Sequence, residues 1–383
     1  MRRTIVDPRF QGILVTLMKA AGISQNRLAK QASVSSPYIS QIINGHRMPS
    51  VEVAHALDEA LGAGGQLTNL VTLAARDDDL DHLAAAAANP TRTATSPAIV
   101  ESLGRVLGGQ RLLDDTMGSA ALVGPVMAQM ETVCRLVTEA AGPSRRPLLH
   151  VAGQWAQFAG WLHTSIGRPL DARTWFGRGL EWATEHGDAD LIATIVSYQG
   201  HSAWLGMQWG ACVGKAEAVL RDETVYAGQR AYDAFQAARG YAALADVAAA
   251  ERMLERGNEL AEAATAWTGE VPPWQYYRAP WLWAMERGLA LLYISRHDRG
   301  SAPNAVAQLQ AGVYGMPAEF RGADWAAEYL AHLATAHMYA DDLDAAETVL
   351  AQARAVATGV KADRVLRMIR GREGRLENLR HPV

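Results

Sequence analysis

The fold of the N-terminal part of the chain is decided by residues 22–50, which read GISQNRLAKQASVSSPYISQIINGHRMPS. Ser24 and Ser35 are of the residue type that caps helix N-termini. Pro37 suits the first turn of a helix, because the N–H group that it lacks would have no partner there. Asn44 and Gly45 form a helix stop. The stretch therefore predicts two short helices joined by a tight turn.

The apolar positions indicate which faces of these helices point inward. The inward positions are Leu28, Ala29, Val34, Ile39 and Ile42. The second helix then exposes a polar edge formed by Ser36, Pro37, Ser40 and Gln41. A helix of this size fits the major groove of B-DNA, where residues near its N-terminus meet base edges. The pattern therefore favours a DNA-reading helix.

Flanking segments extend the bundle on both sides. FQGILVTLMKAAG (10–22) is amphipathic and ends at Gly22, whereas SVEVAHALDEALG (50–62) begins with Ser50 as a cap. Over about residues 10–72 the chain resembles the Xre/Cro-repressor family of helix-turn-helix proteins. The resemblance implies a sequence-specific DNA reader that uses the exposed face of its third helix.

The resemblance also implies roles for single residues. Gln25, at the start of the second helix, resembles the family residue that grips a phosphate and braces the reading helix. The base readers implied by the resemblance are Ser36, Pro37, Ser40 and Gln41. The residues expected at or near the DNA backbone are Ser35, Tyr38, Asn44, His46 and Arg47. Chemistry agrees, because Gln can pair bidentately with adenine and Ser can serve several bases.

This sequence departs from the family in the charge of the reading face. Family members often carry Arg at the positions of Ser36 and Gln41, and a polar residue at Ile43. Residues 1–75 nevertheless hold seven basic against four acidic residues, +3, whereas the whole chain is −4. A nearly uncharged reading face predicts modest affinity for one head, and hence a homodimer on a two-fold double-stranded operator.

Composition sets the broad class of protein. About half of the residues (49%) are hydrophobic and 20% are charged, which is ordinary for a soluble globular protein. No run of eighteen apolar residues and no signal-peptide pattern occurs, so we expect a cytoplasmic protein without a membrane partner. Cys134 and Cys212 are expected to be reduced and buried. No cofactor is expected.

The remainder of the chain predicts an all-α fold, with a head at 1–75, a linker at 76–97 and a helical repeat domain at 98–383. Amphipathic helix pairs are expected at 154–188 and 327–359, with degenerate copies at 190–220 and 241–264. A period of roughly 34–45 residues is typical of a helical solenoid. The two clear pairs resemble tetratricopeptide repeats, with packing residues at Gly160, Ala172, Phe176, Leu180 and Ala183, and at Leu333, Tyr339, Ala345, Leu350 and Ala353.

This combination is also similar, more distantly, to peptide-pheromone-sensing regulators, whose concave solenoid face binds a peptide through asparagines. From residue 98 onward the only asparagines are Asn258, Asn304 and Asn378. A peptide or a small molecule therefore both remain candidate effectors. The candidate ligand residues lie in the proline-interrupted segment 268–288 and are Trp274, Tyr276, Tyr277, Arg278 and Trp281, with Arg278 placed to meet a carboxylate. The other tryptophans, among them Trp155, Trp161, Trp182 and Trp204, are expected to fill gaps between helices.

Two other classes of function compete with a regulator. An enzyme is not expected, because HExxH, GxSxG, P-loop and Rossmann fingerprints are absent. Glu328, His332 and His337 lie on one predicted helix, but the five-residue gap between the histidines places them on different faces, so no metal is expected. The alternative that stays open is an interaction adaptor whose repeats bind another protein and whose head only docks.

Overall fold

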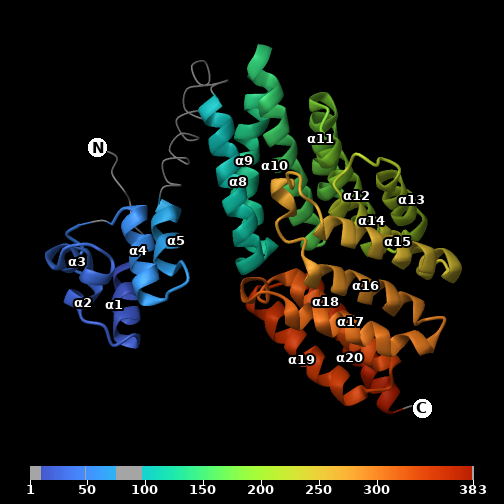
Figure 1. The fold of residues 1–383 in the computed structure, drawn as a ribbon. Coiled ribbons are helices and arrows are strands. Elements are labelled where there is room, and N and C mark those ends of the chain that lie inside the picture. Colours follow the sequence, from blue (N-terminus) through green and yellow to red (C-terminus); the bar gives the residue numbers. More distant parts are fainter. Residues whose placement is uncertain (1–9, 48, 75–96, 382–383) are drawn as a thin grey trace. The chain divides into compact units, whose positions relative to one another are not determined.

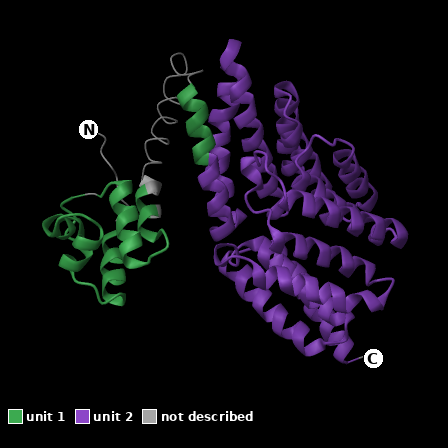
Figure 2. Ribbon diagram, in the orientation of Figure 1, with its two compact units in different colours: residues 1–106 green, residues 107–383 purple. Residues whose placement is uncertain are grey.

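The computed structural model of the chain describes residues 10–47, 49–74 and 97–381. All regular structure in these ranges is helical, without a strand, so the all-α prediction is confirmed. The chain divides into two compact units, residues 1–106 and 107–383 (Figure 2). The two units are described separately below.

Within the described residues 10–47 and 49–74, the first unit has five short helices that enclose one core (Figure 1). Phe10, Leu14, Leu28, Ile39 and Leu57 are fully buried at its centre. Each predicted serine cap is present: Ser24, Ser35 and Ser50 accept hydrogen bonds from the backbone N–H three residues ahead. The helices are α1 (Phe10–Ala20), α2 (Gln25–Gln31), α3 (Ser36–Ile43), α4 (Val51–Leu61) and α5 (Gln66–Ala74).

The boundary between the two units falls inside α8 (Pro97–Met117). Residues 76–96 of the predicted linker lie outside the described residues, and Pro97 begins the helix. The division into a head at 1–75, a linker at 76–97 and a repeat domain at 98–383 therefore stays a prediction.

The second unit is a series of antiparallel helix pairs, with each pair joined by a short turn (Figure 1). α9 (Ser119–Glu139) leads into five pairs, and α20 (Asp363–Arg380) follows the last of them. The pairs are α10 (Arg145–Ser165) with α11 (Pro169–His186), α12 (Ala189–Leu205) with α13 (Trp209–Leu220), α14 (Ala227–Ala243) with α15 (Val247–Thr265), α16 (Pro280–Ile294) with α17 (Ala302–Gly315), and α18 (Asp324–Tyr339) with α19 (Leu343–Gly359). Short 3₁₀ turns lie at η1 (Gly142–Ser144), η2 (Pro273–Gln275), η3 (Arg299–Ser301) and η4 (Ala318–Phe320).

The spacing of the pairs locates an insertion. The first helices begin at residues 145, 189, 227, 280 and 324, so the intervals are 44, 38, 53 and 44 residues. The long interval contains residues 266–279, which hold η2 and the singled-out residues Trp274, Tyr276, Tyr277 and Arg278, whereas Trp281 lies in α16. We call this segment the inserted loop.

The turns within three of the pairs share one backbone conformation. Met207, Ala245 and Asp341 each take a positive φ, of 57°, 64° and 59°, one or two residues after the first helix ends. Asp246 and Asp342 then cap the second helix of their pairs by accepting from a backbone N–H. A left-handed residue is uncommon outside glycine, so its recurrence marks these turns as copies of one unit.

Packing between paired helices uses small residues, as expected. A Cβ atom at Gly160 would lie 2.4 Å from the Phe176 ring, so only glycine lets this ring reach α10. Ala172, Ala183, Leu333, Leu350 and Ala353 are buried as predicted. In α19 the prediction is off by one position, because Ala345 is half-buried and Ala346 is the buried residue.

Two further sequence predictions are qualified by the structure. Cys212 is buried, but Cys134 is half-buried, and both thiols are free. One helix in the described ranges, α9, is long and apolar enough to cross a membrane by length and composition alone. It packs against α10 through a buried stripe that includes Leu122, Val126 and Met130, as a core helix does.

Two glycine-to-alanine substitutions, one at the α16–α17 contact and one at an open position, test the close packing of these helices. A Cβ at Gly312 would lie 2.6 Å from the Trp281 carbonyl oxygen and 2.8 Å from the Met285 backbone nitrogen, and backbone cannot move away cheaply. We expect Gly312→Ala to lower the free energy of unfolding by roughly 1–3 kcal/mol, as measured by chemical denaturation. Gly214→Ala on α13, where a Cβ meets nothing within 4 Å, should instead raise it by about 0.5–1 kcal/mol. Equal effects of the two changes would contradict this account of the packing.

Candidate functional site

The outer face of α3 presents the predicted reading edge. Ile39 and Ile42 are buried in the core of the first unit, so the opposite stripe of the helix faces outward. Pro37, Gln41 and Asn44 are exposed along this stripe, and Ser36 and Ser40 are half-buried beside it. The face has amide and hydroxyl groups and no charge.

Two of these polar groups are held by neighbouring side chains. The Ser36 hydroxyl donates to Asn26 Oδ1 on α2, and Asn44 Nδ2 donates to the Ser40 carbonyl oxygen at 2.9 Å. Asn26 was missed by the sequence analysis, which singled out its neighbour Gln25. The contact joins the first turns of α2 and α3, so the two helices that frame the reading edge are braced against each other.

The predicted backbone-contacting residues surround the ends of α3. The Arg47 guanidinium lies 4.9 Å from the centre of the Tyr38 ring, a cation–π arrangement. Gln25, Asn44 and His46 are exposed. Ser35 uses its hydroxyl oxygen to cap α3, where it accepts from the Tyr38 N–H. The contact of these residues with DNA stays a prediction.

The second unit contains a cavity of about 120 Å³. Its wall is formed by α8 and by the first helix of every pair, α10, α12, α14, α16 and α18, together with the inserted loop. All of its lining residues lie between 111 and 332, within this one unit. The first helices of the pairs therefore share one inward face.

The inserted loop is fixed to that face by buried hydrogen bonds. Trp274 Nε1 donates to Thr194 Oγ1 at 2.9 Å, and Gln275 Nε2 donates to Gln229 Oε1 at 2.8 Å. Tyr276 donates to Asp115 Oδ2 at 2.5 Å, and its neighbour Tyr277 shares a 2.8 Å hydrogen bond with the Tyr198 hydroxyl. These hydrogen bonds hold the loop in place as part of the cavity wall.

Three of the five predicted ligand residues line the cavity, namely Trp274, Tyr276 and Tyr277. Arg278, which was expected to meet a ligand carboxylate, donates to the Gly228 carbonyl oxygen at 2.6 Å and to Gln229 Oε1 at 3.0 Å, and its role toward a ligand stays a prediction. Trp281 stacks on Trp325 with ring centres 6.0 Å apart, and Trp325 faces the cavity. Arg278 and Trp281 therefore support the wall from behind.

Two tryptophans that were expected to fill gaps between helices lie at the cavity instead. Trp161 and Trp204 line it, whereas Trp155 and Trp182 are buried as predicted. The sequence pattern does not distinguish these cases, because all four occupy amphipathic helices.

Two buried ion pairs close part of the cavity wall. Arg239 Nη1 and Glu286 Oε2 lie 2.5 Å apart, and both side chains are 1% exposed. Arg364 binds Glu328 through two contacts, at 3.2 and 2.5 Å. Burial alone would raise the pKa of Glu328, but the Arg364 guanidinium lowers it to about 2. Each of these charges has its counter-charge.

Two carboxyl groups in the wall have neutral partners only. Asp114 accepts from Ser119 Oγ and Trp161 Nε1, each at 2.7 Å. Asp115 accepts from the Tyr276 hydroxyl and from Trp325 Nε1. Burial raises the pKa of both carboxyls, that of Asp115 to about 6. The signal in the sequence is the pair Asp114-Asp115, which follows Leu112 and Leu113 near the end of α8.

The histidines of the cavity are neutral. Burial and the nearby Arg239 lower the pKa of His201 to about 3, and burial lowers that of His332 well below its usual range. Glu328 and His332 face the cavity together, whereas His337 lies 3.4 Å from Asp342 on another face of α18, as the spacing predicted. All three side chains are buried.

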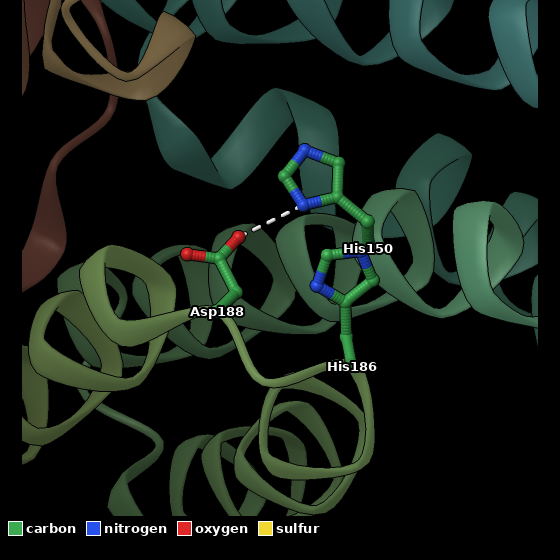
Figure 3. Close-up of side chains that lie close together, drawn as sticks. All are labelled: His150, His186 and Asp188. Atoms are coloured by element: carbon green, nitrogen blue, oxygen red, sulfur yellow. Dashed lines mark ion pairs between the residues drawn. The ribbon is translucent and has the colours of Figure 1, made fainter.

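A separate cluster of possible metal ligands joins α10 to the start of α12. Figure 3 shows His150, His186 and Asp188 around a common point, with donor atoms within 4.8 Å of one another. His150 Nδ1 lies 2.8 Å from Asp188 Oδ2, and the other carboxylate oxygen of Asp188 caps α12 through the Leu191 N–H. An ion pair and a helix cap thus account for the carboxylate, and we assign no metal to this cluster.

Comparison with known proteins places the first unit. Residues 14–64 match the helix-turn-helix family model, which confirms the family resemblance of this domain. No curated protein matches the chain. Among solved structures, the crystal structure of Bacillus thuringiensis PlcR in complex with the peptide PapR7 and DNA is similar, with a TM-score of 0.41 and 9% sequence identity, over 95% of this chain and 99% of that one. The family match and the repeated helix pairs of the second unit together show that the chain combines a helix-turn-helix domain with a helical-repeat domain.

The buried Arg239–Glu286 pair yields a stability prediction. Glu286→Gln leaves the guanidinium buried without its counter-charge, so we expect the free energy of unfolding to fall by roughly 3–5 kcal/mol. Glu259→Gln, which breaks the exposed pair with Arg256 on α15, should cost about 0–1 kcal/mol. Chemical denaturation of the full chain measures both. A loss in Glu286→Gln no larger than in Glu259→Gln would show that the buried pair does not hold the wall.

Asp115 yields a pH prediction. The pKa of Asp115 rises from 3.8 to about 6 on folding. Between these two pH values the folded state binds more protons than the unfolded state. The free energy of unfolding therefore falls as pH rises through this window. Asp115→Asn keeps both hydrogen bonds, because Oδ1 accepts from Trp325 and Nδ2 donates to the Tyr276 oxygen. We expect the free energy of unfolding of the variant, relative to that of the wild type, to rise by about 2–3 kcal/mol between about pH 4 and pH 6. Above pH 6 this difference should stay constant.

Denaturation curves at several pH values measure this difference. Asp341→Asn is the control, because the Asp341 side chain is 90% exposed in the α18–α19 turn. A stability difference for Asp115→Asn that depends on pH no more than that of the control would contradict the raised pKa.

Proposed function

We propose that the protein is a sequence-specific DNA-binding transcriptional regulator. The observation that carries the proposal is the helix-turn-helix match over residues 14–64 together with the exposed outer face of α3. A second helix of this kind enters the major groove with its N-terminal residues at the base edges. A regulator of this kind acts in the cytoplasm.

Side-chain chemistry decides which residues we assign to bases and which to the phosphate backbone. Gln41 is the strongest candidate for base reading, because its exposed amide can donate to and accept from adenine at once. Ser36, Pro37 and Ser40 complete the reading edge. Gln25, Tyr38, Asn44, His46 and Arg47 are assigned to the phosphate backbone, where contacts set position, and Ser35 directs the N-terminus of α3 towards it.

The proposal includes a homodimer on a two-fold operator. The α3 face has no charged side chain, so one head gains little from phosphate attraction. Two linked heads bind with much higher affinity than one, because the second contact is intramolecular. Light scattering of the full chain and a palindromic operator would support this part of the proposal.

The repeat unit is proposed to hold the effector. Its cavity is lined by aromatic side chains with polar and charged groups between them, a combination suited to binding and orienting a small ligand. An effector that binds one arrangement of the repeats better than another shifts the population of DNA-binding molecules. The repeats would then control whether two heads fit one operator.

Operator selection tests the DNA-reading role. A pool of random duplexes enriched on the full chain supplies the operator, and gel-shift titration gives affinities. We expect Gln41→Ala to weaken operator binding at least roughly fivefold, since one bidentate base contact is worth about 1–3 kcal/mol. Gln66→Ala, an exposed glutamine of α5 away from the reading face, is the matched control and should bind like the wild type.

Two results would contradict the proposal. If no sequence is enriched and no duplex is bound above background at low salt, the chain is better explained as an interaction adaptor. If Gln66→Ala weakens binding as much as Gln41→Ala, α3 is not the reading helix. A genuine reader should also lose affinity steeply with rising salt while keeping its preferred sequence.

A further inference from the structure

The charges around the cavity of the repeat unit do not balance. Glu286 and Glu328 are paired with arginines, but Asp114 and Asp115 accept hydrogen bonds from neutral donors only. Asp324, immediately before Trp325, accepts from Ser165 Oγ at 2.6 Å, and its other oxygen, Oδ1, is buried without a partner. Among the described residues, none of these three aspartates forms an ion pair.

One cation shares the wall without balancing these acids. Arg111 lies one turn before Asp114 and Asp115 on α8 and is 7% exposed. Its Nη1 donates to Gln154 Oε1 at 3.4 Å, while its Nη2 is buried without a partner. Among the residues that line the cavity, two carboxyl groups, Asp114 and Asp115, are therefore unpaired against one unpaired guanidinium. Asp324, Arg278 and Arg372 lie outside this lining and have no ion-pair partner among the described residues either.

Such an imbalance costs stability in the empty protein. A buried carboxylate without a counter-charge is strongly unfavourable, and a hydrogen bond from a neutral donor offsets only part of the cost. Buried groups of this kind gather at sites where a ligand supplies the missing charge. The ligand that these carboxyl groups lack is a cation.

The aromatic walls favour the same kind of ligand. Trp161, Tyr276 and Trp325 hold the two carboxyl groups through their N–H and O–H groups, and the same three residues line the cavity. Trp325 is fixed from behind by stacking on Trp281. Aromatic faces attract organic cations, more strongly where water is excluded.

The size of the cavity limits the ligand. About 120 Å³ corresponds to on the order of ten water positions, and so to a ligand of about ten non-hydrogen atoms. That volume fits a ring with a short side chain.

We propose that this cavity binds a small organic cation, an aromatic amine whose ammonium group lies against Asp114 and Asp115 and whose ring lies against Trp161 and Trp325. The unpartnered Arg111 Nη2 faces a ligand oxygen where the amine carries one. This inference rests on the proposed function, in which the cavity is the effector site, and it specifies the class of effector.

Matched probe series on the full chain test the inference. Phenethylamine, 2-phenylethanol and phenylacetate carry one ring with a positive, neutral or negative end, and tryptamine, tryptophol and indole-3-acetate do the same on a larger ring. Isothermal titration at neutral pH measures their binding. We expect at least one amine to bind tenfold or more tightly than its alcohol, and neither carboxylate to bind.

Variants then locate the charge that is recognised. Asp115→Asn should lower affinity for the amine tenfold or more, to that of the alcohol, and leave the alcohol unchanged. Asp114→Asn tests the same charge independently, because its Oδ1 can accept from Trp161 while Nδ2 donates to Ser119 Oγ. Asp341→Asn, on the exposed α18–α19 turn, is the control and should bind the amine like the wild type. Thermal melts confirm that each variant folds.

Several outcomes overturn the inference. An alcohol or carboxylate that binds as tightly as its amine rules out recognition of a cation. An absence of binding by both amines, or an unchanged amine preference in the folded Asp114→Asn and Asp115→Asn variants, does so too.

Operator affinity, measured separately from amine binding, tests the proposed function. If an amine binds but operator affinity stays the same when it is added, the cavity takes a cation without being an effector site. If the chain binds no operator, amine binding is still measurable, and only the regulator proposal falls. A shift in operator affinity that Asp115→Asn abolishes would support both proposals together.

Discussion

The repeat unit depends on how it accommodates charge in its interior, and the Arg239–Glu286 pair is the centre of that arrangement. A buried guanidinium is tolerated only when its charge and its N–H groups find partners. Arg239 meets Glu286 on α16, Gln236 and Tyr232 on its own helix α14, and the Trp204 ring on α12 at 4.7 Å. Glu286 in turn accepts from Tyr329 on α18. The pair thus links the first helices of four successive repeats, and a cavity between them keeps a fixed shape.

The paired and unpaired charges of the cavity have different physical meanings. Pairs such as Arg364–Glu328 satisfy themselves, so they hold helices together whether or not a ligand is bound. Asp114 and Asp115 have only neutral partners, and burial raises the pKa of both carboxyls, so the folded protein disfavours their ionised form. A sequence selected for stability alone would place amides or apolar residues there. Stability lost at a defined place is typical of a site that acts on something else.

The two units differed in how far their sequence could predict them. The head depends on signals a few residues apart, such as Ser35 capping α3 and Gly45 ending it, and these were read correctly. The cavity joins residues that are distant in sequence: Asp115 lies 161 residues from Tyr276 and 210 from Trp325. No local pattern reports such contacts. Trp281 and Arg278 belong to the same aromatic segment as Trp274, Tyr276 and Tyr277, yet only the latter three line the cavity.

The inserted loop also helps to distinguish a regulator from an adaptor. An adaptor of this architecture needs its inner face open along the repeats, so that a partner segment can lie across the first helices. Here the loop occupies that face and is tied to α12, α14 and α8 through Thr194, Gln229 and Asp115. A partner protein would have to break these buried hydrogen bonds, whereas a small molecule needs only the space that the loop encloses. On the effector proposal, the insertion thus converts a surface suited to chains into a site suited to one small ligand.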